Sequence, residues 1–303
     1  MTSLITGANG FIGRRLVQPG ARCLMRNLTA MPSSVRGDLL DFSSLVSACE
    51  GTETIFHCAG YAHAFSSSDP DVHWRINYEG TRNLLVAAGQ AGVRRFIFLS
   101  SVKAMAEPGD VCADEDWPGE PMTHYGKSKR AAENAVLEAG AKYGMHVVNL
   151  RLAMVYGRGG RGNLERMARA IRSGWFPPLP ETGNRRSLVH VKDVVEVMRL
   201  VAEKPEASGQ TYIVADSCAY SGRQIYESIR TALDLSALPS FTVPAGFLRA
   251  AGHLNARLGE IVDRLIGSEC YSPARIEQEL GWRARIGLTE GLREMLSIPG
   301  TVR

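Results

Sequence analysis

The first half of the chain alternates short, uninterrupted apolar runs with longer amphipathic runs, and this alternation restricts the fold more than any other feature. Continuous apolar runs rich in Val, Ile, Leu and Phe are typical of strands buried on both faces of a parallel sheet. Helical spacing of apolar residues at 77–92 and 125–144 predicts helices between such strands. The alternation predicts an α/β fold with a doubly wound parallel sheet. The predicted strands are 3–6, 22–25, 54–59, 96–101 and 146–152.

A glycine-rich loop follows the first predicted strand in the run "TGANGFIG". Gly7, Gly10 and Gly13 permit a tight turn and let the backbone approach a pyrophosphate, whose charge the N–H groups of a helix N-terminus stabilise. A strand–turn–helix without a ligand can use the same glycines, but a strand before and a helix after them favour a Rossmann-type dinucleotide site. We therefore expect NAD or NADP as cofactor. Further predicted contacts in this loop are Asn9, Phe11 and Ile12.

The residue that follows the second predicted strand bears on the choice between these cofactors. Arg26 stands where an NAD-preferring site carries an acidic residue for the ribose hydroxyls, and an arginine there can pair with the 2′-phosphate of NADP(H). Stacking on adenine and simple exposure to water remain alternative roles for Arg26. Asp38, after a turn, is a candidate acceptor for the adenine amino group, whereas the neighbouring Asp41 can cap a helix.

Tyr125 and Lys129 lie four residues apart and share one face of the predicted helix 125–144. A phenol is a poor base at neutral pH, and we expect a nearby ammonium to lower its pKa. Tyr125 would then exchange a proton with an alcohol or ketone while hydride moves. An exposed Tyr–Lys pair is the alternative interpretation. Ser101, at the end of a predicted strand, favours the catalytic one, because the carboxyl ends of parallel strands form ligand sites.

After about residue 158 the alternation changes, and a glycine-rich loop leads into a proline-rich segment. We interpret 1–160 as the dinucleotide-binding domain, with segments near 186–216 returning to it. Residues 161–303 are then mostly a smaller C-terminal substrate-binding lobe. Its predicted elements are helices at 164–173, 221–234, 244–259 and 288–296, and strands near Leu188 and at 209–215.

Composition excludes several classes of protein. The net charge of +4, from 35 basic and 31 acidic side chains, does not indicate a nucleic-acid partner. No apolar run is long enough for a membrane span, and the N-terminus lacks a signal-peptide pattern, so we expect a cytoplasmic protein with no membrane partner. The six scattered cysteines predict reduced thiols, with neither a disulfide nor a metal site.

Short sequence motifs are spread over nearly the whole chain. They are "TGANGFIG" (6–13), "GDLLD" (37–41), "HCAG" (57–60), "NYEGTRNLL" (77–85), "FLSS" (98–101), "YGKSK" (125–129), "RLAMVYGRG" (151–159), "RRSLVHVKDV" (185–194) and "ELGW" (279–282). With them the chain resembles the extended short-chain dehydrogenase/reductases, the NAD-dependent epimerase/dehydratase family of nucleotide-sugar epimerases, dehydratases and 4-ketoreductases.

The resemblance implies roles for particular residues. Ser101, Tyr125 and Lys129 would be the catalytic trio, with Lys129 also bridging the nicotinamide ribose. Arg186 would contact the substrate diphosphate. Other implied positions are Leu39 beside adenine, Ala59 and Gly60 under the cofactor, Asn77 supporting the active-site helix, and Lys103 and Asn163 at the substrate. A homodimer through the helices at 78–91 and 125–143 is also implied.

Departures from the family pattern narrow the expected chemistry. Val102 and Lys103 replace the Asp–Glu pair of the dehydratases, so dehydration is not expected. The family's second phosphate-binding segment is missing, which leaves Arg264 and Arg275 as candidates. The resemblance implies oxidoreduction at C4 of a UDP-hexose or UDP-N-acetylhexosamine, as a 4-epimerase or 4-ketoreductase. An NADP(H)-dependent reductase of a smaller carbonyl or sterol-like substrate, and a non-catalytic cofactor sensor, are the alternatives.

Overall fold

The computed structural model describes residues 2–28, 33–62, 69, 71–160, 162–235 and 242–297. In these residues seven parallel strands form one sheet in the order β10-β7-β5-β4-β1-β2-β3. The predicted doubly wound parallel sheet is therefore confirmed. The strands are β1 (Ser3–Thr6), β2 (Arg22–Met25), β3 (Ser34–Arg36), β4 (Thr54–His57), β5 (Arg95–Ser101), β7 (His146–Leu152) and β10 (Gln210–Val214).

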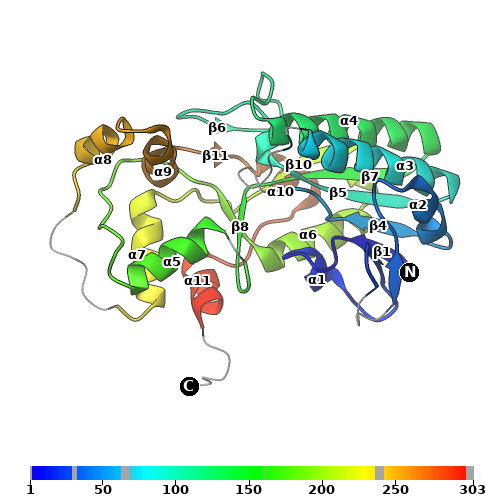
Figure 1. The fold of residues 1–303 in the computed structure, drawn as a ribbon, viewed down its shortest axis with the longest axis horizontal. Coiled ribbons are helices and arrows are strands. Elements are labelled where there is room, and N and C mark those ends of the chain that lie inside the picture. The colour runs from blue at the N-terminus through cyan, green and yellow to red at the C-terminus, as the bar shows by residue number, and fades with distance from the viewer. Residues whose placement is uncertain are drawn as a thin grey trace.

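Helices cover both faces of this sheet. α2 (Phe42–Cys49), α3 (Gly80–Gln90) and α4 (His124–Tyr143) lie on one face, and α1 (Gly13–Leu16) and α6 (Val191–Glu203) lie on the other (Figure 1). Each face has its own apolar core, in which strand side chains such as Phe96 and Ile97 point in opposite directions. This double coverage explains why the strands read as continuous apolar runs.

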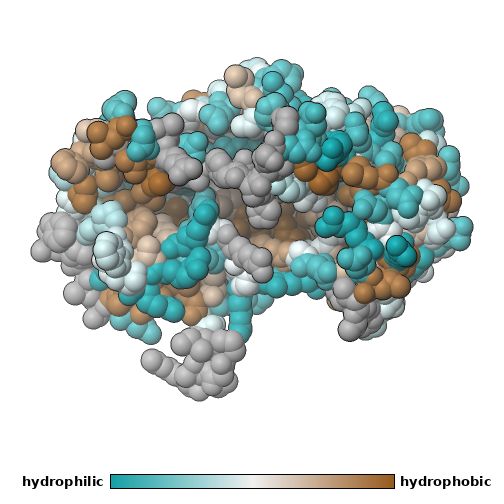
Figure 2. All heavy atoms as spheres, in the orientation of Figure 1, coloured by the Kyte–Doolittle hydropathy of each residue, from teal (hydrophilic) through white to brown (hydrophobic). Residues whose placement is uncertain are grey.

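A second group of helices forms the lobe on the left of Figure 1. They are α5 (Asn163–Arg172), α7 (Gly222–Ala232), α8 (Ala245–Gly252), α9 (Ala256–Ile266) and α11 (Leu288–Leu296), with α10 (Ala274–Leu280) beside β10. Five of them, α5, α7, α8, α9 and α11, contribute to a separate apolar core. Apolar side chains also reach the surface over α8 and α9 (Figure 2). The division of the chain near residue 160 stays a prediction.

The helix predicted at 244–259 is two helices in the structure. The side chain of Asn255 accepts a hydrogen bond from the backbone N–H of Leu258 at 2.9 Å and caps a new helix, α9. Asparagine is among the strongest N-cap residues, so the polar position inside the apolar pattern marked this break. The sequence interpretation also passed over β3, α6 and α10.

Two small parallel sheets connect the lobe to the main sheet. β8 (Met154–Tyr156) pairs with β9 (Leu188–His190), and β6 (Cys112–Ala113) pairs with β11 (Cys270–Tyr271). The second pairing sets Cys112 opposite Cys270, and the two form a disulfide.

The prediction that all six cysteines are reduced thiols is therefore wrong for this pair. Cys112 and Cys270 are 158 positions apart in the sequence, and only the pairing of β6 with β11 brings them together. The other four cysteines, all within the described residues, are free.

Two kinds of feature are absent from the described residues. No helix there combines the length and apolarity that crossing a membrane requires. No three His, Cys, Asp or Glu side chains there gather into a group able to hold a metal ion.

Candidate active site

The glycine loop lies where β1 ends and α1 begins. Gly7 has a φ of 66°, and a Cβ there would stand 2.8 Å from the backbone nitrogen of Ala59. A Cβ on Gly10 would stand 2.9 Å from the carbonyl oxygen of Gly7. These positions require glycine, because any side chain would collide with backbone that cannot move away. The loop thus keeps the open cradle that a pyrophosphate needs.

A cleft of about 540 Å³ opens beside this loop at the carboxyl edge of the sheet. Eight of the predicted cofactor residues line it: Gly7, Asn9, Gly10, Arg26, Asp38, Leu39, Ala59 and Gly60. Its size and donors fit a dinucleotide. The sequence interpretation did not assign the other ten lining residues to the cofactor: Thr6, Ala8, Leu24, Met25, Asn27, Gly37, Leu40, Cys58, Tyr61 and Ile76.

Three predicted loop residues stand outside the lining of the cleft. Gly13 lets α1 approach the backbone of Gly7, and Ile12 packs on the core between α1 and the sheet. The guanidinium of Arg15 lies over the Phe11 ring, 4.7 Å from the ring centroid. The same guanidinium donates a hydrogen bond to the Phe11 carbonyl. These residues shape the loop rather than the cleft surface.

The two acidic residues after β3 have different surroundings. Asp41 caps α2, where its carboxylate accepts a hydrogen bond from the backbone N–H of Ser44. Asp38 lines the cleft, and its Oδ1 accepts from the backbone N–H of Leu40 at 2.9 Å. One carboxylate oxygen of Asp38 thus stabilises the turn formed by residues 38–40. Arg26 is exposed at the edge of the same cleft.

Asn77 is buried in a π-helical turn (Trp74–Glu79) that leads into α3. Its side chain accepts a hydrogen bond from the Tyr61 N–H at 2.7 Å and donates to the Tyr61 carbonyl and the Ser128 hydroxyl, both at 3.1 Å. Asn77 therefore ties the segment after β4 to α4. Asn77 thus supports the helix that carries Tyr125 and Lys129 and, through Tyr61, also contacts the lining of the cofactor cleft.

Ser101, Tyr125 and Lys129 meet at the carboxyl end of β5. Ser101 is the last residue of β5, and its hydroxyl hydrogen-bonds the Tyr125 phenol in the first turn of α4. Thr123 caps this helix by accepting from the Gly126 N–H at 3.0 Å, which fixes the start of the turn. The Lys129 ammonium donates to the Leu99 carbonyl at 2.7 Å and lies 4.5 Å from the centre of the Phe98 ring.

Lys129 also reaches the cofactor cleft. A Cβ built on Gly60, which lines that cleft, would stand 3.5 Å from the Lys129 ammonium nitrogen. The sequence-predicted trio is thus in one place, beside the cleft and on the side of the sheet edge that faces the lobe.

Burial controls the acidity of both α4 groups. Burial lowers the pKa of Lys129 to about 8, although the Glu133 carboxylate opposes this change. Burial raises the pKa of Tyr125, and only the hydrogen bond with Ser101 opposes it. The expectation that the pKa of Tyr125 is lowered is therefore wrong for the chain without ligands. The reason is that loss of hydration outweighs the favourable contacts of a phenolate.

A buried ion pair stands behind this trio. The Glu133 carboxylate accepts from Arg151 at 2.8 Å and from the Ser100 hydroxyl at 2.5 Å, with both charged side chains almost fully buried. Because Glu133 lies one turn after Lys129, this pair joins α4 to the ends of β5 and β7. It holds the site's scaffold in place.

His73 also lies at the site, where the sequence interpretation did not place it. Its ring meets the Tyr125 ring edge-on at 5.7 Å, and its Nδ1 donates to the Tyr61 carbonyl at 3.1 Å. His73 stands one helical turn before Asn77, and that spacing was the available signal.

On the lobe side, Arg186 is nearly fully buried. Its guanidinium donates to the Gly267 carbonyl at 3.1 Å and pairs with Glu269 at 3.2 Å. The ammonium of Lys103, two residues after Ser101, pairs with the same Glu269 at 2.8 Å. Glu269 therefore joins two predicted substrate-binding cations, and no motif in the sequence indicated it.

Arg186 and Asn163 both line a lobe cavity of about 410 Å³. Most of the lining is apolar, and Asn163 is held through Arg166. Of the two other arginine candidates, Arg275 pairs with Asp116 at 2.6 Å, away from this cavity. The side chain of Arg264 lies outside the described residues. The other lining residues are Met154, Leu164, Arg166, Met167, Ala170, Phe176, Leu179, Gly222, Ile225, Ile261 and Leu265.

Known proteins match this chain over most of its length. A UDP-glucose 4-epimerase of Vibrio cholerae is 29% identical, covering 96% of this chain and 93% of its own. The N-acetyl-alpha-D-glucosaminyl-diphospho-ditrans,octacis-undecaprenol 4-epimerase of Escherichia coli O157:H7 is also 29% identical, covering 91% and 84%. The solved UDP-glucose 4-epimerase of Thermus thermophilus, in complex with NAD, is 26% identical with a TM-score of 0.75 over 97% of each chain.

The family model described as "NAD dependent epimerase/dehydratase family" matches residues 3–215, which span the glycine loop, the Ser–Tyr–Lys trio and all seven strands of the main sheet. The match agrees with the fold and with the cleft beside the trio. The chain therefore belongs to the NAD-dependent epimerase/dehydratase family of extended short-chain dehydrogenase/reductases and is an enzyme of that family.

Proposed function

We propose that this enzyme carries out NAD(P)-dependent oxidoreduction at C4 of a nucleotide-activated sugar, of the UDP-hexose or UDP-N-acetylhexosamine type. One observation carries the proposal: the hydrogen-bonded Ser101–Tyr125 pair and the buried Lys129 lie between a dinucleotide-sized cleft and a lobe that offers Arg186. A proton-transfer group beside a hydride carrier is what interconversion of an alcohol and a ketone needs.

In this proposal each residue of the trio has one task. The nicotinamide of a bound cofactor supplies or accepts the hydride. Tyr125 takes the proton from the substrate hydroxyl during oxidation and returns it during reduction. Ser101 orients the same oxygen by hydrogen bonding. Lys129 holds the nicotinamide ribose, and in the complex with the cofactor its positive charge favours the phenolate. In the chain without ligands, Ser101 alone opposes the effect of burial on the phenol.

The proposed substrate class rests on the lobe. Arg186 is a natural partner for a diphosphate, because a guanidinium donates two parallel hydrogen bonds to phosphate oxygens. The apolar cavity beside it suits the flat faces of a base or a sugar. The curated relatives above are a UDP-glucose 4-epimerase and a 4-epimerase of a diphosphate-linked N-acetylglucosamine. They favour 4-epimerisation as the outcome.

A specific observation favours the second candidate, 4-ketoreduction. Arg26 stands exposed at the cofactor cleft, where a guanidinium can pair with the 2′-phosphate of NADP(H). An epimerase regenerates its cofactor at each turnover, whereas a reductase must exchange it. On this account Arg26→Ala weakens NADPH binding about tenfold and leaves NADH binding nearly unchanged.

The test is to denature the purified enzyme and identify the nucleotide that it releases. Near-stoichiometric NAD supports epimerisation, and UDP-hexoses with their N-acetyl forms are then the substrates to assay. Release of no nucleotide, with ready binding of added NADPH, supports the reductase, and 4-keto sugar nucleotides are then the substrates. Turnover of a small non-nucleotide ketone that Arg186→Ala does not slow contradicts the proposed substrate class.

We also propose a homodimer, in which α3 and α4 of two copies form a helix bundle. Light scattering at micromolar concentration tests this, and a monomer contradicts it. A cofactor-sensing role without catalysis would require that Tyr125→Phe leaves the function intact.

A further inference from the structure

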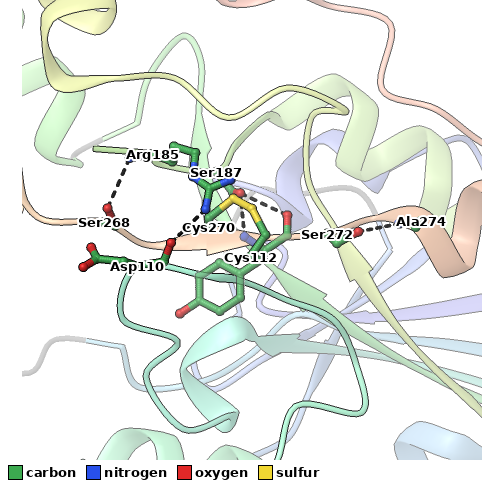
Figure 3. The surroundings of a disulfide bond; sticks show 9 residues. Asp110, Cys112, Arg185, Ser187, Ser268, Cys270, Ser272 and Ala274 are labelled. Carbon is green, nitrogen blue, oxygen red and sulfur yellow. Dashed lines mark hydrogen bonds between the residues drawn. A yellow bond between two sulfur atoms is a disulfide. The ribbon is translucent and has the colours of Figure 1, made fainter. Parts of the chain in front are cut away.

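Two segments far apart in the sequence are fastened together beside the proposed substrate site. The first is the 102–123 segment, which leads from Ser101 at the end of β5 to the cap of α4, and therefore connects two residues of the trio. The second is the lobe segment that ends in β11 and contains Glu269. In Figure 3 the disulfide between Cys112 and Cys270 lies at the point where these segments meet.

Non-covalent links also join the 102–123 segment to the lobe. The Lys103 ammonium pairs with Glu269 at 2.8 Å, next in sequence to Cys270. The Arg185 guanidinium donates to the Asp110 carbonyl at 2.8 Å (Figure 3). Lys103 and Glu269 are each about one-third exposed, and such ion pairs contribute little on their own because water competes for both charges. The covalent bond keeps the two partners at a high effective concentration.

The lobe side of this junction has anchors that do not depend on the disulfide. The Glu269 N–H donates to the Arg185 carbonyl at 2.8 Å, and the Tyr271 N–H donates to the Ser187 hydroxyl at 2.9 Å. The neighbouring Glu115 is also anchored independently, since its carboxylate accepts from the Ile213 N–H at 2.7 Å. Residues 105–112 follow Lys103 after one residue, and outside the disulfide the Arg185–Asp110 hydrogen bond and the short β6–β11 pairing hold them to the lobe. They are therefore the part that breaking the disulfide loosens most.

Reductants can reach this bond. Cys112 is exposed, whereas Cys270 is almost fully buried. Thiol–disulfide exchange requires a thiolate to approach one sulfur, so the exposed Cys112 is the point of attack, and exposed disulfides are the ones that are reduced most readily.

We propose that the Cys112–Cys270 bond is a redox-sensitive staple that positions Lys103 for the substrate diphosphate. When the bond is closed, residues 105–112 are ordered and Lys103 is held at Glu269 beside Arg186. The turn at 102–104 still holds the Lys103 backbone when the bond is opened, but the Lys103 side chain must then be ordered during binding, and affinity for the diphosphate falls. The inference rests on the proposed function, because it takes the substrate to carry a diphosphate.

The redox step is an exchange with a dithiol. A dithiol thiolate attacks the Cys112 sulfur and forms a mixed disulfide, while the Cys270 sulfur leaves and takes up a proton. The second dithiol thiolate then attacks the mixed disulfide and releases Cys112 as a thiol. The protein gains two electrons and two protons, and the dithiol becomes a cyclic disulfide.

The first experiment measures hydrogen exchange with and without dithiothreitol, after thiol titration of the denatured, untreated protein. We expect four titrating thiols before reduction and six after it, since four cysteines are free. Reduction should speed amide exchange in 105–112 at least about tenfold and leave α7 unchanged. Six thiols before reduction, or unchanged exchange in 105–112, would overturn the inference.

The second experiment measures binding of UDP and of NAD by calorimetry in both redox states. Reduction should weaken UDP binding about three- to tenfold and change NAD binding less than about twofold. Cys112→Ser should bind UDP as weakly as the reduced wild type, and the dithiol should not change its affinity. The control Cys218→Ser, at an exposed free cysteine, should lose UDP affinity on reduction as the wild type does. In Lys103→Met, UDP affinity should no longer depend on redox state.

The outcomes separate the staple from the proposed function. Equal UDP affinity in the two redox states, in a protein that binds UDP, overturns the inference and leaves the proposed function standing. A redox-dependent exchange rate in a protein that binds UDP in neither state supports the staple and contradicts the nucleotide-sugar substrate.

Discussion

The Ser101 hydroxyl hydrogen-bonds the Tyr125 phenol, and so the end of β5 and the first turn of α4 are joined at the point where proton transfer is proposed. Removing the phenol hydroxyl in Tyr125→Phe should lower kcat about 10²- to 10⁴-fold, because that group carries the proton. The melting temperature should change little, since the ring remains. Steady-state kinetics and a thermal melt check this.

The matched variant Ser101→Ala removes the orienting hydroxyl and keeps the proton-transfer group. We expect a smaller loss than for Tyr125→Phe. If Ser101→Ala proved the more damaging change, the assignment of the proton to Tyr125 would be wrong.

The buried ammonium of Lys129 lowers the stability of the fold. Burial lowers its pKa to about 8 from an ordinary value of 10.5, so the unfolded chain binds more protons between these two pH values. The free energy of unfolding should therefore rise with pH across this window, and the full penalty, on the order of 3 kcal/mol, applies below pH 8.

Lys129→Met should consequently lose activity and yet melt no lower than the wild type at pH 7. The difference in stability between the two proteins should shrink as the pH is raised from 8 toward 10.5. Thermal melts at three pH values measure this. A variant that is clearly less stable at pH 7, with an unchanged circular dichroism spectrum, would mean that the lysine's hydrogen bond to Leu99 outweighs its desolvation.

The pH dependence of the reaction should reflect the raised pKa of Tyr125 in the free enzyme. Oxidation needs the phenolate, so kcat/KM for alcohol oxidation should increase from pH 7 to pH 9. Reduction needs the phenol and should lose no activity below pH 8. Rate profiles in both directions test this, and a falling oxidation profile over the same range would argue against Tyr125 as the base.

Arg186 should contribute to substrate affinity and not to cofactor affinity. Arg186→Ala should raise KM for a sugar nucleotide about 10- to 100-fold, because a charge-assisted contact with phosphate is lost. The control Arg172→Ala removes an exposed arginine of α5 that does not line the lobe cavity, and it should leave KM unchanged. If both variants raised KM equally, the cause would be the loss of one positive charge from the protein, and not the loss of a specific contact between Arg186 and phosphate.

Local patterns predicted the sheet and the glycine loop because their causes are local. The required φ of Gly7 and the continuous apolar strands are properties of neighbouring residues. The i,i+4 spacing likewise placed Tyr125 and Lys129 on one helix face.

Contacts made by the tertiary fold gave no such signal. Glu269 reaches Lys103 because β11 pairs with β6, and the same pairing joins Cys112 to Cys270. Glu269 reaches Arg186 through a separate backbone pairing of their two segments. The pKa of Tyr125 was predicted in the wrong direction because a sequence shows the neighbouring charge and not the burial.

The most direct test of the account is proton NMR of UDP-glucose and UDP-N-acetylglucosamine, each incubated with the enzyme and NAD in deuterated water. The account predicts the C4 epimer with its C4 hydrogen retained, since the hydride returns from the cofactor. If epimers are absent, it predicts reduction of a 4-keto sugar nucleotide by NADH or NADPH. Exchange of deuterium into C4, or no turnover of any nucleotide sugar by an enzyme that binds its cofactor, would contradict it.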